Sequence, residues 1–192
     1  VLSFSSGCKW ITSEPMIVED NNSWKDLSAN GITDLGMAFE ELTSMLSRKK
    51  FLKSPSLSYA PVIFLMTDGY PTDNYKKGLE KLKNNNWYKY GMKIALGIGD
   101  YFDESVLEEF TENKELVVKA ANSSQLAKLI KTIAVTSSQI ASKSMTIVSD
   151  EENELDYEDV EGNKQKEMVK IVQDTVSDDE FIETLELEDG WD

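Results

Sequence analysis

Hydrophobic and polar residues are arranged in two different ways along the first 140 residues. Two runs of consecutive apolar residues, at 62–67 and 92–98, predict strands that are buried on both faces. Elsewhere, apolar residues recur at every third or fourth position, which predicts helices with one buried side. These helical apolar residues are Leu35, Ala38, Phe39, Leu42 and Leu46; Leu79 and Leu82; Val106, Leu107 and Phe110; and Leu126, Leu129, Ile130 and Ile133.

Shorter extended segments complete the pattern. Residues 1–6 and 10–11 predict two short strands on either side of a turn at Gly7, residues 16–18 another extended piece, and residues 116–118 a last strand. Strands and helices thus alternate along the chain. The sequence therefore predicts an α/β fold, Rossmann-like, with a mostly parallel sheet flanked by helices.

The charge of the chain is concentrated at its C-terminal end. Residues 143–192 hold 18 acidic and four basic residues, so they carry −14 of the net charge of −15 and leave −1 for residues 1–142. We therefore expect two parts, a folded domain over 1–142 and an acidic, flexible tail over 143–192. Without a basic face, neither nucleic acid nor an anionic membrane surface is an expected partner.

The acidic tail leaves two interpretations open. The simpler one is a solvated extension, within which residues 168–176 could form one or two amphipathic turns. The other is a docking or self-inhibitory segment, because a purely solvating tail needs no large apolar side chains. Near its end the tail contains Phe181, Ile182, Leu185, Leu187 and Trp191.

Two residue counts restrict the chemistry. The chain has one cysteine, Cys8, and no histidine. No disulfide can form within the chain, and a reduced, partly buried thiol is expected. The lack of histidine removes the usual general base and the commonest zinc ligand, which favours a function without catalysis. There is no signal-peptide pattern and no apolar run of membrane-spanning length, so a cytoplasmic location is expected.

Two oxygen-bearing side chains stand where sites form in α/β proteins. Asp68 ends an apolar strand and is followed by Gly69, and Thr33 begins a helix just after Gly31. A carboxylate and a hydroxyl are suitable ligands for Mg²⁺ or Mn²⁺. Each residue alone also fits a simpler role, Asp68 in a turn and Thr33 with its neighbour Asp34 in a helix cap. As metal ligands, the two would have to converge at one rim of the sheet.

The residues around these two positions carry a family resemblance. Residues 31–39, GITDLGMAF, resemble the second metal-site loop of von Willebrand factor type A domains, and residues 62–73, VIFLMTDGYPTD, resemble the third. Residues 94–99 and 107–111 resemble the strand and helix that follow, and residues 1–6 resemble the second strand of the family. The order of these segments is correct over roughly residues 1–140.

The resemblance implies a metal site and a partner. Thr33 would be its hydroxyl ligand and Asp68 its carboxylate ligand, for Mg²⁺ or Mn²⁺, and an acidic side chain of another protein would complete the coordination. Family members also have a first strand followed by an Asp-x-Ser-x-Ser loop, which this sequence does not contain. The resemblance therefore implies an N-terminally truncated domain, with either a gap between the strands at 1–6 and 62–67 or direct pairing of the two.

Three functions follow from these observations. The first is a metal-assisted protein-binding module, and residues 66–73 resemble in particular bacterial proteins linked to tellurite resistance and stress operons. The second is a metal-independent scaffold with a vestigial site. The third is a Mg²⁺-dependent phosphotransferase, which needs a nucleophilic aspartate two residues before the second aspartate. Met66 occupies that position before Asp68, which disfavours the third function.

Overall fold

The computed structural model describes five stretches of the chain, residues 1–12, 14, 30–52, 61–148 and 157–177. The chain divides into two compact units, the first formed by Val1–Ser58 and Tyr70–Lys89 and the second by Tyr59–Gly69 and Tyr90–Asp192. The extended piece expected at 16–18 and the apolar residues expected at 181–191 lie outside the described residues.

The first unit combines a hairpin with helices. Strands β1 (Leu2–Ser5) and β2 (Gly7–Trp10) pair antiparallel, with Gly7 opposite Ser5, whereas the sequence places the second strand at 10–11. Gly7 has a φ of +85°, a backbone conformation that glycine adopts without strain. The helices are α1 (Leu35–Met45), α2 (Tyr75–Lys83) and α3 (Asn86–Lys89).

Helices α1 and α2 approach each other at two glycines. A Cβ atom built on Gly78 of α2 would lie only 2.3 Å from the carbonyl oxygen of Gly36 in α1, so the two backbones are in direct contact. Any side chain at either position would push the helices apart. The buried apolar residues of both helices are Leu35, Ala38, Phe39, Leu79 and Leu82, and Leu46, directly after α1, is buried as well.

The C-terminal end of α1 is held by a side chain from the loop after α2. The Asn85 side-chain nitrogen Nδ2 donates to the carbonyl oxygens of Thr43, at 3.3 Å, and Leu46, at 3.0 Å. These carbonyls belong to the last turn of the helix, where no intrahelical donor is left for them. Asn85 thus fixes the end of α1 that lies away from Thr33.

The second unit is built on a parallel sheet. Strands β3 (Val62–Thr67), β4 (Met92–Ile98) and β5 (Val117–Ala120) lie in the order β3-β4-β5, and both pairs are parallel. The remaining elements are α4 (Glu104–Thr111), the short 3₁₀ helix η1 (Lys114–Leu116), α5 (Ser123–Val148) and α6 (Tyr157–Val176). The predicted α/β class with a parallel sheet is confirmed.

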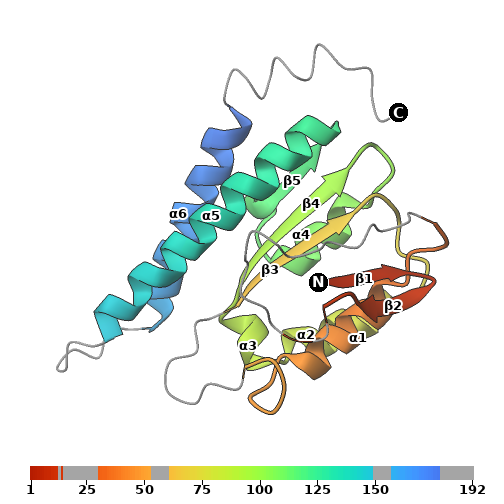
Figure 1. Ribbon diagram of the computed structural model, residues 1–192, viewed down its shortest axis with the longest axis horizontal. Helices are drawn as coiled ribbons and strands as arrows, with labels where there is room; N and C mark the ends of the chain where they lie inside the picture. The colour runs from red at the N-terminus through yellow and green to blue at the C-terminus, as the bar shows by residue number, and fades with distance from the viewer. Residues whose placement is uncertain (13, 15–29, 53–60, 149–156, 178–192) are drawn as a thin grey trace. The chain divides into compact units, whose positions relative to one another are not determined.

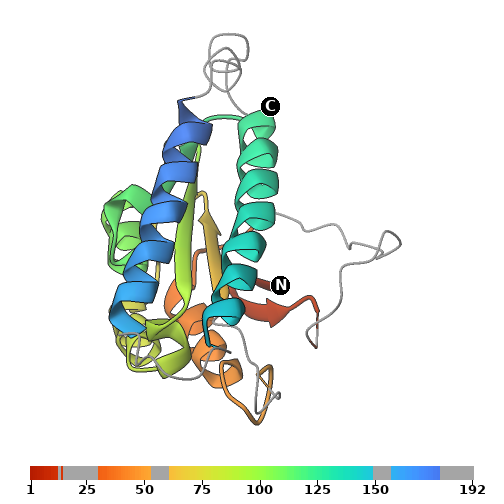
Figure 2. The same cartoon turned by 90° about the vertical axis from the view of Figure 1, so that its left-hand side faces the viewer.

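Helices cover both faces of this sheet. Figures 1 and 2 show α4 on one face and α5 on the other. Side chains alternate along β4 accordingly, because successive residues of a strand point to opposite faces. Ile94 and Leu96 join the apolar cluster with α5, whereas Lys93 forms an ion pair with Glu112 at the end of α4.

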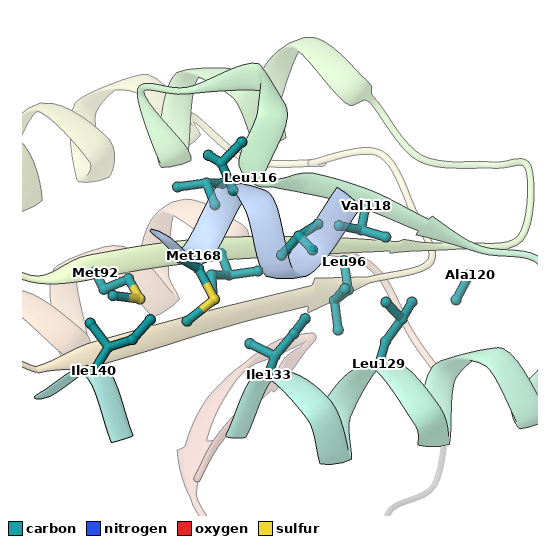
Figure 3. Close-up of a cluster of buried hydrophobic side chains, with 12 residues drawn as sticks. Met92, Leu96, Leu116, Val118, Ala120, Leu129, Ile133, Ile140 and Met168 are labelled. Atoms are coloured by element: carbon teal, nitrogen blue, oxygen red, sulfur yellow. The ribbon is translucent and has the colours of Figure 1, made fainter. Parts of the chain in front are cut away.

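The main apolar cluster lies between the sheet and the two long helices. Figure 3 shows Leu129 and Ile133 of α5 directed toward Leu96 of β4, with Met168 of α6 in the same cluster. All four side chains are fully buried. Burying a side chain of this size stabilises the fold by about 1.5–3 kcal/mol relative to leaving it exposed, so the cluster anchors both helices.

Helix α6 lies within residues 143–192, for which the sequence predicts an acidic tail with one or two amphipathic turns. Met168, Val169 and Val172 repeat at helical spacing and are buried in the cluster, and the Gln173 amide nitrogen donates to the Glu115 carboxylate at 3.2 Å. Three apolar residues on one face suffice to hold a helix on an existing core, even where the composition is mostly charged. The division at residue 142 stays a prediction, although α5 itself continues to Val148.

The strands at 1–6 and 62–67 belong to different units, so the expected gap or direct pairing between them stays a prediction. Among the described residues, β1 pairs with β2 in a two-stranded sheet, and β3 pairs with β4 in a three-stranded sheet. In the described part of the chain, no helix is long and apolar enough to cross a membrane.

We predict that Gly78→Ala destabilises the first unit by about 1–3 kcal/mol, because the new methyl group meets the α1 backbone. Helix propensity alone predicts the opposite, a gain of about 1 kcal/mol. Urea denaturation of this variant, beside Lys77→Ala as an exposed control on the same helix, distinguishes the two. A Gly78→Ala protein more stable than the parent would contradict the close contact.

A second prediction concerns Glu112, whose backbone has the left-handed conformation with a φ of 59°. Its carboxylate oxygen Oε2 lies 2.9 Å from the ammonium group of the buried Lys93. Glu112→Ala should lower the free energy of unfolding by about 1–3 kcal/mol, since the buried lysine loses this partner. Glu112→Gly should be about 1 kcal/mol less damaging than Glu112→Ala, because glycine tolerates a positive φ. Equal stability of the two variants in urea would disprove the strain at this position.

Candidate functional site

Thr33 lies in the first unit, two residues before α1 begins. Its backbone N–H donates to the Thr72 hydroxyl Oγ1 at 3.0 Å, and the Thr72 N–H donates back to the Thr33 carbonyl at 2.9 Å. Both backbone groups of Thr33 are therefore occupied. Its hydroxyl takes part in no hydrogen bond with any described residue, so the oxygen is available to a ligand.

Asp34, the next residue, does not act as the helix cap that its position suggests. It occupies the N-cap position of α1 without a capping hydrogen bond. Its carboxylate oxygen Oδ2 instead accepts from the Gly7 N–H at 2.7 Å, and its own N–H donates to the Ser5 carbonyl at 3.0 Å. Asp34 thus ties the loop to the β1–β2 turn and leaves the start of α1 to another residue.

The cap of α1 comes from Asp73, which precedes helix α2. Its two carboxylate oxygens accept from the N–H groups of Gly36, at 2.9 Å, and Met37, at 3.0 Å. These are free donors of the first helical turn, and a negative charge there is further stabilised by the helix dipole. This role could not be predicted from the sequence, since Asp73 is 37 residues away from Gly36 along the chain.

Asp68 lies in the second unit, directly after β3. The preceding residue, Thr67, is paired with Gly97 of β4 and is buried, so the strand end is fixed. The Thr67 hydroxyl accepts from the Gly69 N–H at 3.3 Å and so shapes the turn. The Asp68 side chain itself is exposed and has neither a hydrogen bond nor an ion pair with a described residue.

The four oxygen-bearing residues therefore fall into two classes. Asp34 and Asp73 are engaged by backbone N–H groups, whereas the side-chain oxygens of Thr33 and Asp68 bond to none of the described residues. A hydroxyl and a carboxylate are hard oxygen donors, which fit Mg²⁺ or Mn²⁺ in chemistry and supply part of the required coordination. Thr33 and Asp68 belong to different units, so their convergence stays a prediction.

Other metal-binding chemistry is weaker in the described residues. They contain no group of three or more histidine, cysteine, aspartate or glutamate side chains able to hold a metal ion. Burial raises the pKa of the Cys8 thiol, and the negative charges of Glu41 and Asp34 raise it further. Since metals bind the thiolate, the raised pKa disfavours Cys8 as a ligand at neutral pH.

Comparison with known proteins shows a similarity to solved structures in fold. No family model matches the sequence, and no curated protein sequence matches it. The solved structure of proximal thread matrix protein 1 from the mussel byssus, with a zinc-occupied MIDAS motif, is similar with a TM-score of 0.51 at 24% identity. The similarity covers 68% of this chain and 33% of that one. A second crystal form gives a TM-score of 0.50 at 23% identity, with 68% and 34% covered.

The fold is von Willebrand factor A-like. This agrees with the parallel sheet and with the order of the resembling segments in the sequence. The chain spans about a third of the length of the mussel chains it matches.

We predict that removing an engaged carboxylate and removing an unengaged one have different effects on the free energy of unfolding. Asp34→Ala should lower the free energy of unfolding by about 1–2 kcal/mol, because the Gly7 N–H loses a charged acceptor at 2.7 Å. Asp68→Ala should change it by less than about 0.5 kcal/mol, since this exposed side chain has no described partner. Urea denaturation of both variants measures the difference. A large loss in Asp68→Ala would show that Asp68 has a structural role.

Proposed function

We propose that this chain is a metal-assisted protein-binding module of the von Willebrand factor A type. Thr33 and Asp68 hold the cation. The observation that carries this proposal is a difference in hydrogen bonding: the side-chain oxygens of Thr33 and Asp68 bond to no described residue, whereas Asp34 and Asp73 are engaged by backbone groups. Oxygens that accept no hydrogen bond from the described residues are the ones that remain available to coordinate a cation.

Mg²⁺ or Mn²⁺ suits these residues better than zinc does. The donors are a hydroxyl and a carboxylate, and the chain has no histidine. The similar mussel protein has a zinc-occupied MIDAS motif, which supports metal binding in such folds in general. When bound, the cation supplies positive charge and an open coordination position for a carboxylate of the partner.

A protein partner is supported by the surface beside Thr33. Ile32 and Met37 are each 51% exposed, and Tyr70 is 56% exposed, all within the first unit. Ile32 adjoins Thr33, the Met37 N–H donates to Asp73, and Tyr70 lies two residues before Thr72. Exposed apolar side chains around polar groups are typical of protein-binding surfaces. The partner would therefore offer an apolar side chain near an acidic one.

The cellular role is proposed on sequence grounds. Binding by coordination breaks no bond, so the module needs no nucleophile and works without catalysis. Residues 66–73 resemble the bacterial tellurite-resistance and stress proteins, which suggests a role of that kind in the cytoplasm. The single cysteine is consistent with a reducing compartment.

One observation favours a second candidate, a metal-independent scaffold. Residues 1–192 contain no Asp-x-Ser-x-Ser segment and so do not themselves supply three of the side-chain ligands that the resemblance implies. A cation held by fewer protein ligands keeps more water and binds more weakly. In the scaffold, Thr33 and Asp68 would be remnants and the exposed apolar side chains alone would bind the partner.

A titration with Mn²⁺, followed by electron paramagnetic resonance of the free ion, tests the proposal. We expect binding that weakens at least tenfold, by about 1.4 kcal/mol or more, in Asp68→Ala and in Thr33→Val. Two matched controls should bind like the parent. They are Glu104→Ala, an exposed acid on α4, and Thr43→Val, whose hydroxyl donates within α1.

If the parent protein binds no Mn²⁺, or if Asp68→Ala and Thr33→Val both leave Mn²⁺ binding unchanged, the metal-independent scaffold is favoured. Phosphatase turnover that disappears in Asp68→Ala would instead support the phosphotransferase.

A further inference from the structure

The segment 71–73 is joined to the start of α1 at several points. Thr72 and Thr33 exchange two hydrogen bonds, of 3.0 and 2.9 Å, and Asp73 accepts from the first turn of the helix. The Thr72 hydroxyl also lies 3.5 Å from the Asp34 carboxylate oxygen Oδ1. Every one of these bonds lies within the first unit. We call this group of contacts the Thr33 clamp.

Gly36 leaves the space that Asp73 occupies. A Cβ atom on Gly36 would lie 2.8 Å from the Asp73 oxygen Oδ2 and 2.8 Å from the Asn74 carbonyl oxygen. A Cβ atom essentially never lies that close to a nonbonded oxygen, so a side chain at Gly36 would displace the carboxylate. The glycine and the aspartate are thus two parts of one arrangement.

We propose that Asp73 is a positioning residue, which fixes where the Thr33 hydroxyl stands without binding the cation itself. Both of its carboxylate oxygens already accept hydrogen bonds from α1. The proposal rests on the proposed function, since it names how the same site is held. It adds a residue that the resemblance does not assign to the site.

Positioning matters most for a neutral ligand. A threonine hydroxyl attracts a cation far less strongly than a carboxylate does, so its contribution depends on being held in place before the cation arrives. The clamp occupies the N–H and carbonyl of Thr33 and leaves only its hydroxyl free. Outer residues of this kind typically change metal affinity by about 10-fold to 100-fold when they are removed.

A purely structural role for Asp73 would have a different effect on stability and on Mn²⁺ affinity. If Asp73 only caps α1, its removal lowers the stability of the first unit, and Mn²⁺ affinity changes no more than in any equally destabilised variant. Asn85→Ala provides that comparison, because Asn85 holds the opposite end of α1 through Thr43 and Leu46 and does not contact Thr33.

The experiment measures Mn²⁺ affinity and urea stability of the full chain with Asp73→Ala, Asp73→Asn, Gly36→Ala and Asn85→Ala. We expect Asp73→Ala and Gly36→Ala to weaken Mn²⁺ binding by about 10-fold to 100-fold. Asp73→Asn, which keeps one acceptor oxygen, should weaken it less. Asn85→Ala should lose stability and keep the parent affinity. Equal affinity loss in Asn85→Ala and Asp73→Ala would overturn the proposal.

A measurement without metal separates this proposal from the proposed function. In the metal-free protein, the Thr33 methyl and amide resonances should shift in Asp73→Ala and Gly36→Ala and stay unchanged in Asn85→Ala. If the parent binds no Mn²⁺, the proposed function fails, and these shifts alone decide whether Asp73 positions Thr33. Unshifted Thr33 resonances in Asp73→Ala would overturn the positioning role, whatever the affinity.

Discussion

The first unit depends on the contact between the Asp73 carboxylate and the first turn of α1. This contact satisfies two N–H groups that the helix cannot satisfy internally, at Gly36 and Met37. It requires a glycine at position 36, and the nearby Gly78 lets the backbone of α2 lie directly on that of α1. The same segment orders Thr33 through Thr72. Two neighbouring residues, Thr72 and Asp73, therefore hold the backbone of the candidate ligand Thr33 and cap the start of α1.

Most of the fold could be predicted because its elements are encoded locally. The run at 62–67 coincides with β3 and the run at 92–98 with β4, since continuous apolar residues between turn residues leave few alternatives. Helix α6 was not predicted at its full length, because only a few apolar residues hold it and the surrounding composition is acidic. Such a helix depends on an existing core, which local patterns do not reveal.

The site could be predicted only in part for a similar reason. Thr33 and Asp68 stand at positions that local sequence marks, a helix start and a strand end. The roles of Asp34 and Asp73 depend on bonds to residues that are 27 and 37 positions away, and no local pattern encodes such pairs. The structure adds the distinction that supports the proposed function, namely which oxygens are engaged and which are free.

The central claim is that Thr33 and Asp68 share one cation, although they belong to different units. Paramagnetic broadening by Mn²⁺ tests this most directly, because it acts only on nuclei close to the bound ion. The account predicts that substoichiometric Mn²⁺ broadens the amide resonances of residues 31–34 and 67–69 together, at the same concentration. Broadening of one segment without the other, or of neither, would contradict it.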